Sequence, residues 1–82
     1  MGNGNNQYTL RRALEQSRTN MGDLMRRMPS LPKTKGQRRL LRKHGSPKAF
    51  ARGCIAALGE ISVEEATVAI LKYRDEWNSA LH

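Results

Sequence analysis

Helix-breaking residues divide this chain into helix-sized pieces and so decide its fold class. Two prolines lie in residues 29–34, Gly45 lies two residues before a third proline, and Gly59 precedes the last helical pattern. Proline and glycine at such places end helices. Between the breaks, apolar residues recur at helical spacing, and strand-like alternation is absent from the sequence. We therefore expect an all-α fold, a small bundle of four (or five) short helices.

The first two helices are predicted on either side of the proline segment. Apolar residues over 9–28 follow a helical stripe, either in one kinked helix or in two shorter ones divided near Gly22. Thr34 and Gln37 match a capping box, in which each of the two residues binds the backbone N–H of the other. The second helix is expected to begin there and to run to His44.

The last two helices are predicted in the second half of the chain. Residues 47–58 are apolar on nearly every side, so this helix is expected in the middle of the fold. A second capping box, Ser62 to Glu65, begins a helix over about 63–80.

The charge is divided unevenly along the chain. Its 82 residues fit one domain, which we assign to 8–82 after a disordered lead over 1–7. The basic half, 8–44, carries 11 basic and 2 acidic residues, whereas the neutral-to-acidic half, 45–82, carries 4 and 5. The formal net charge of +8 therefore comes from the first half, which indicates a polyanion-binding half and a scaffold half.

Six cations with no acid among them form the densest part of the basic half. The candidate nucleic-acid-binding residues are Lys33, Lys35, Arg38, Arg39, Arg42 and Lys43, extended by Arg26 and Arg27. On a helix, Arg38, Arg39 and Arg42 share one face, since residues three and four apart are neighbours. A phosphate backbone would relieve their mutual repulsion and release counterions. The alternative is a solvated basic face without a partner.

Duplex DNA is favoured over RNA as the polyanion. RNA recognition often stacks bases on aromatic rings, but Phe50 and Trp77 are expected in the core. A helix-turn-helix across 37–58 would make the third helix the reader, and that helix offers only Lys48 and Arg52 among small and apolar side chains. We therefore expect low intrinsic sequence specificity. Binding of an arginine-rich helix to structured RNA remains an alternative.

The sequence predicts neither an enzyme nor a cofactor or metal site. Cys54, the single cysteine, lies in an apolar pattern typical of a core residue, and no ligand spacing is present. His44 fits a cap at the end of the second helix. The longest apolar run is far short of a membrane span. These features fit a cytoplasmic, reducing location, at the nucleoid in a bacterium.

The last helix is the candidate protein-binding element. Its candidate partner-binding residues are Glu64, Tyr73, Glu76 and Trp77. Tyr73 and Trp77 suit the core, but they would anchor an interface if this helix were half covered. A homodimer is also left open.

In size, in charge and in the basic run from Lys33 to Lys43, the chain resembles the small basic accessory transcription regulators of phages and plasmids, such as repressor modulators of the Lxc (Bof) type. The resemblance implies a co-repressor or modulator that adds DNA-backbone contacts and binds a partner repressor. Two alternatives remain: an inhibitor of a transcription enzyme such as RNA polymerase, and an arginine-rich RNA-binding antitermination factor.

Overall fold

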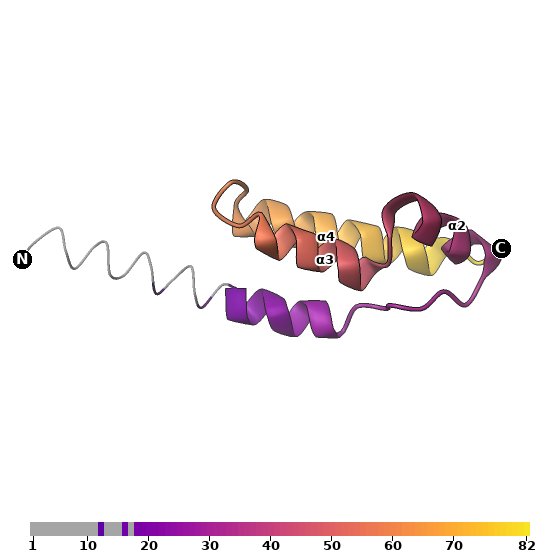
Figure 1. The fold of residues 1–82 in the computed structure, drawn as a ribbon, viewed down its shortest axis with the longest axis horizontal. Coiled ribbons are helices and arrows are strands. Elements are labelled where there is room, and N and C mark those ends of the chain that lie inside the picture. Colours follow the sequence, from indigo (N-terminus) through magenta and orange to yellow (C-terminus); the bar gives the residue numbers. More distant parts are fainter. Residues whose placement is uncertain (1–11, 13–15, 17) are drawn as a thin grey trace, which may run out of the picture.

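The computed structural model describes residues 12, 16 and 18–82, and this part of the chain folds into helices joined by loops, without a strand (Figure 1). The helices after the proline segment are α2 (Lys35–His44), α3 (Pro47–Ala56) and α4 (Val63–Ser79). The all-α prediction is therefore confirmed. The lead over 1–7 and the start of the first helix lie outside the described residues.

A further helical segment precedes the prolines. Residues 18–26 are helical and pass through Gly22 without a break. The helix ends ahead of Pro29, because the residue before a proline avoids helical backbone angles. Met21 and Met28 are buried, so the methionines of this segment pack into the core as expected.

Serine hydroxyls cap the helices α3 and α4 at their N-terminal ends. The Ser46 hydroxyl accepts a hydrogen bond from the Ala49 N–H at 3.1 Å and begins α3. At the start of α4, the Ser62 hydroxyl accepts from the Glu65 N–H at 3.0 Å, and the Glu65 carboxylate accepts from the Ser62 N–H at 3.4 Å. Each cap contributes about 1 kcal/mol to helix stability.

The third predicted cap forms in one direction only. The Thr34 hydroxyl accepts from the Gln37 N–H at 3.0 Å, as in a capping box. The Gln37 side chain does not return to Thr34: its carbonyl oxygen accepts from the Lys33 N–H at 2.7 Å, and its amide donates to the Trp77 carbonyl at 3.0 Å. The expectation of a full capping box here is wrong, because the buried Gln37 amide joins α2 to α4 instead.

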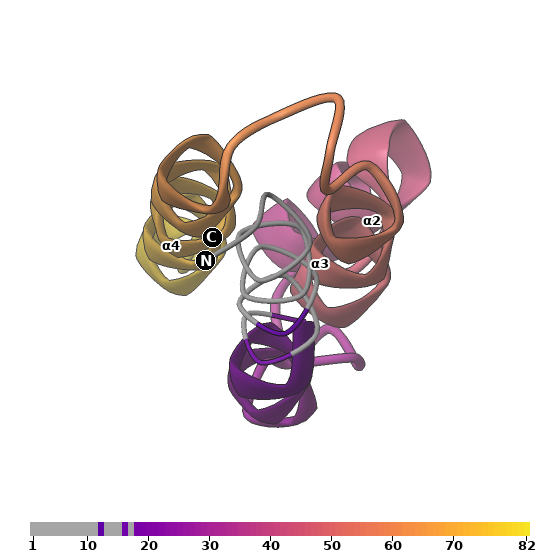
Figure 2. The ribbon, with the colours of Figure 1, turned by 90° about the vertical axis from the view of Figure 1, so that its left-hand side faces the viewer.

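The hydrophobic core lies where the 18–26 segment, α3 and α4 meet, and the end-on view shows the three around one centre (Figure 2). Its buried members are Met21, Met28, Ala51, Leu58, Ala66 and Ile70. The core is continued toward α2 by the aromatic rings of α4. The Tyr73 ring lies edge-on to Phe50 and to Trp77, with centroids 5.1 and 6.4 Å apart.

Helix α3 corrects the expectation of a fully central helix. It ends at Ala56, earlier than predicted, and buries one face only: Ala51 is 0% exposed, whereas Arg52, Gly53 and Ala56 are exposed. Small side chains remove little apolar area from water, so a helix rich in alanine and glycine can leave one side open at little cost. Gly59, in the loop after α3, takes the positive φ that glycine allows.

Candidate nucleic-acid interface

Helix α2 carries the basic run and is fixed to α4 at its N-terminal end by polar contacts. Gln37 is 7% exposed and binds the Trp77 carbonyl, while the Thr34 hydroxyl donates to the Ala80 carbonyl. These two carbonyls lie at the C-terminal end of α4, where backbone acceptors lack partners within the helix. Side chains at the start of α2 therefore supply hydrogen-bond donors to the carbonyl groups at the end of α4.

The C-terminal end of α2 is fixed by Tyr73. The Tyr73 hydroxyl donates to the Gly45 carbonyl at 2.6 Å and lies 3.3 Å from the Leu40 carbonyl oxygen. Leu40 and Leu41, the apolar residues of α2, are only half-buried. The sequence analysis missed Gln37 and Tyr73 as the anchors of this helix, although Gln37 lies on the same face as both leucines.

The outer face of α2 carries five exposed cations. Successive residues of an α-helix are turned by about 100°, so these five lie within an arc of about 140°. They are Lys35, Arg38, Arg39, Arg42 and Lys43. Lys33, in the loop just before the helix, is exposed as well. The predicted basic segment is thus presented as one surface, which we call the α2 basic face.

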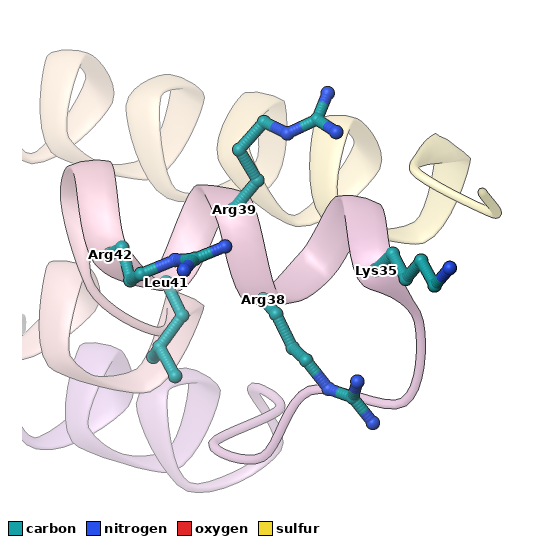
Figure 3. A pocket seen from close by; sticks show the side chains of 5 residues that line it. All are labelled: Lys35, Arg38, Arg39, Leu41 and Arg42. Atoms are coloured by element: carbon teal, nitrogen blue, oxygen red, sulfur yellow. The ribbon is translucent and has the colours of Figure 1, made fainter.

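The α2 basic face is hollowed by an open pocket of about 470 Å³. The close view shows the Arg38 and Arg39 side chains extending to opposite sides of α2, with Arg42 lying along the helix between them (Figure 3). Lys35 and Leu41 complete the lining. Guanidinium groups spread in this way suit an extended anion with several charged groups better than a single ion in a closed cavity.

Among the described residues, no ion pair neutralises the α2 basic face, although Glu76 of α4 lines a hollow together with Arg39 and Lys43. In residues 12, 16 and 18–82, the ion pairs described are Arg26–Asp23 and Arg74–Asp75, and neither involves α2. Arg26 is therefore already paired on its own helical segment. Arg27 is exposed beside it, and neither residue lines the pocket on α2. The structure brings the run from Lys33 to Lys43 together but keeps Arg26 and Arg27 on a separate segment.

The end of α2 also has a structural use for positive charge. Arg42, Lys43 and His44 occupy the last turn, where cations complement the negative end of the helix dipole. The His44 ring lies edge-on to Tyr73, with centroids 5.9 Å apart. This arrangement fits the expectation that His44 closes the helix.

The candidate partner-binding residues of α4 fall into two groups. Tyr73 is 5% and Trp77 1% exposed, so the core interpretation of both is confirmed and neither ring is available to a partner. Glu64 and Glu76 are exposed. Burial, and to a lesser extent the Glu76 carboxylate, raises the pKa of Tyr73, which keeps its hydroxyl a hydrogen-bond donor.

Cys54 is half-buried beside the core, and desolvation raises the pKa of its thiol, so the reactive thiolate is disfavoured. Within residues 12, 16 and 18–82, no cluster of three or more histidine, cysteine or acidic side chains has the arrangement of a metal site. Across the same residues, none of the helices combines the length and apolar character that a membrane crossing requires.

Comparison of the chain with protein-family models, with curated proteins and with solved structures gave no match.

Proposed function

We propose that this protein is a small basic accessory regulator of transcription, of the co-repressor or modulator type, which contacts the DNA backbone through the α2 basic face. The observation that carries the proposal is the set of exposed cations on α2 that form no ion pair among the described residues. Holding like charges together costs free energy, and a phosphate backbone removes this cost while counterions are released. Such binding would place the protein on DNA in the reducing cytoplasm.

The fixed position of α2 supports binding to a rigid duplex. Its two ends are held to α4 by Gln37, Thr34 and Tyr73, so the cations project from a helix that does not need to fold on binding. Preorganised contacts lose less conformational entropy when the complex forms.

Low intrinsic sequence specificity is part of the proposal. Phosphate contacts position a protein on DNA but carry no base information. The neighbouring helix α3 exposes Ala49, Arg52, Gly53 and Ala56, which offer one long polar side chain to base edges. An accessory protein of this kind would gain its target from a partner DNA-binding protein.

The test is the salt dependence of binding between the isolated protein and a fluorescent 30-base-pair duplex. About five phosphate contacts predict a slope near −4.5 in log K against log salt concentration. The variant Arg38→Gln/Arg39→Gln/Arg42→Gln should lose about three units of this slope while its circular dichroism stays helical. A matched variant, Arg27→Gln/Arg52→Gln/Arg74→Gln, removes three cations outside α2 and should retain most of the slope.

Two rivals give different results in the same assay. An arginine-rich RNA-binding factor would bind a structured RNA more tightly than the duplex at equal salt. An inhibitor of a transcription enzyme, whose basic face meets an acidic protein groove, would bind neither nucleic acid measurably. Either result would overturn the proposal.

A further inference from the structure

The exposed side of α4 carries a strip with apolar residues at its centre and acidic residues at both ends. The α4 strip consists of Glu64, Glu65, Val68, Ala69, Lys72 and Glu76. Two hollows lie along it and share Ala69 and Lys72, so they form one continuous depression. At the α2 end, His44, Phe50 and Tyr73 are also among the lining residues.

No described helix covers the α4 strip. The 18–26 segment packs on another side of α4, where the Thr67 hydroxyl reaches Met21. Figure 2 shows that segment on one side of the α3–α4 pair. Val68 remains 64% exposed on the uncovered side, so the strip presents apolar surface between its acidic ends.

The spacing of the α4 strip fits a helix as its occupant. From Glu64 to Glu76 the strip covers 13 residues, a rise of about 18 Å along the axis. Its members recur three and four residues apart, which is the repeat that lets one helix lie along another. Side chains from a second apolar stripe would enter the two hollows beside Ala69.

The charges on the strip favour a basic occupant over a second copy of this chain. Paired antiparallel, two copies would bring Glu64 and Glu65 of one chain near Glu76 of the other. In a parallel pair, each glutamate would face the same glutamate of the other copy, and Lys72 would face the Lys72 of the other copy. Like charges opposed in either arrangement disfavour self-association, whereas lysine or arginine beside the occupant's apolar stripe would meet acidic groups at both ends.

We propose that the α4 strip binds a basic amphipathic helix of a partner protein. The inference rests on the proposed function, because an accessory regulator needs a protein partner. It assigns the docking to exposed residues of α4 in place of the buried Tyr73 and Trp77.

The probe for this surface is a labelled 15-residue peptide of leucine and lysine, with the leucines on one helical face. A control peptide has the same composition in an order without that stripe. Binding is measured by fluorescence anisotropy, with the full-length protein at low and moderate salt. The striped peptide should bind at least tenfold more tightly than the control peptide.

Two pairs of matched variants separate the apolar and the charged contributions. Val68→Ser should weaken binding about fivefold, while Leu81→Ser, which changes an equally exposed apolar residue elsewhere, should leave it within twofold. Glu64→Gln/Glu76→Gln should weaken binding about tenfold and flatten its salt dependence. Glu60→Gln/Asp75→Asn removes the same charge off the strip and should have little effect.

The inference is overturned if the two peptides bind equally, or if the strip variants behave like their controls. It is also overturned if sedimentation shows a dimer of the wild-type protein that Val68→Ser dissociates, since the occupant would then be a second copy. The DNA assay distinguishes the two proposals: Val68→Ser should bind duplex as the wild type does, and the arginine variant of α2 should still bind the striped peptide more tightly than the control peptide.

Discussion

Gln37 and Trp77 join the first turn of α2 to the last turn of α4 through one hydrogen bond, from the Gln37 side-chain amide to the Trp77 carbonyl at 3.0 Å. The other end of the same amide accepts from the Lys33 N–H at 2.7 Å. One buried side chain thus satisfies a helix end and the loop that carries the first cation of the basic run. The position of the α2 basic face depends on this amide.

Removal of the amide should destabilise the fold while leaving the charge unchanged. Gln37→Ala leaves the Trp77 carbonyl and the Lys33 N–H without these partners, at an expected cost of about 1–3 kcal/mol. Urea unfolding followed by circular dichroism measures the cost. Arg39→Ala, at an exposed position of the same helix, should change stability by less than about 0.5 kcal/mol. Equal stability of the two variants would contradict the anchoring role of Gln37.

Gly36 should be required for the close approach of α2 to the C-terminal residues. A Cβ at this position would lie 2.5 Å from the His82 carbonyl oxygen and 3.1 Å from the Ala80 Cβ. We therefore expect Gly36→Ala to displace these residues and to lower the melting temperature, although alanine is the better helix former. In α3, Gly53 has open space around it, so Gly53→Ala should stabilise the protein by about 0.5–1 kcal/mol. Removal of Leu81 and His82 should restore part of the stability that Gly36→Ala loses.

Burial along α3 predicts sharply different effects of one substitution on neighbouring turns. Ala51 is 0% exposed in the core, so Ala51→Asp should bury an unpaired charge and unfold the domain. Ala56 is exposed on the same helix, and Ala56→Asp should leave the protein folded. Circular dichroism and the melting temperature distinguish the two variants. A folded Ala51→Asp protein would contradict the described core.

Tyr73 should make folding stability fall at alkaline pH. Burial and the Glu76 carboxylate raise the pKa of Tyr73, so the folded protein keeps a proton that the unfolded chain releases above about pH 10. The stability from this group is complete below pH 10 and declines as the pH rises toward the raised pKa. Tyr73→Phe should cost about 1–2 kcal/mol at pH 8, because the Gly45 carbonyl loses its donor. Between pH 8 and pH 11, this variant should lose less stability than the wild type.

Helix starts were predictable from local chemistry, whereas the end of α3 and the extent of burial were not. Ser46 and Ser62 cap their helices because the signal lies within a few residues of sequence. The exposure of Ala56 and the burial of Gln37 depend on which helix packs against which, and periodicity alone leaves that open.

The candidate site also has a part that the sequence predicted and a part that it did not. The basic run was visible as a block of charge, and its exposure on one helix follows from helical spacing. The ion pair that occupies Arg26 and the hollows along α4 come from contacts between side chains, which the sequence pattern could not predict.

The last prediction separates phosphate contacts from base reading on the α2 basic face. Arg38→Ala, Arg39→Ala and Arg42→Ala should each lower the salt slope of DNA binding by about one and weaken all duplex sequences alike, because phosphate contacts carry no base information. Each side chain is exposed, so folding stability should stay within about 0.5 kcal/mol of wild type.

Arg52→Ala, on the exposed side of α3, is the matched control and should leave the slope unchanged. The measurement is a set of binding titrations at four salt concentrations on duplexes that differ by single base pairs. If one arginine variant lost affinity at a single base step only, that guanidinium would contact a base edge, with about 1–3 kcal/mol of discrimination. The protein would then select its own DNA site, and a partner would be needed for regulation alone.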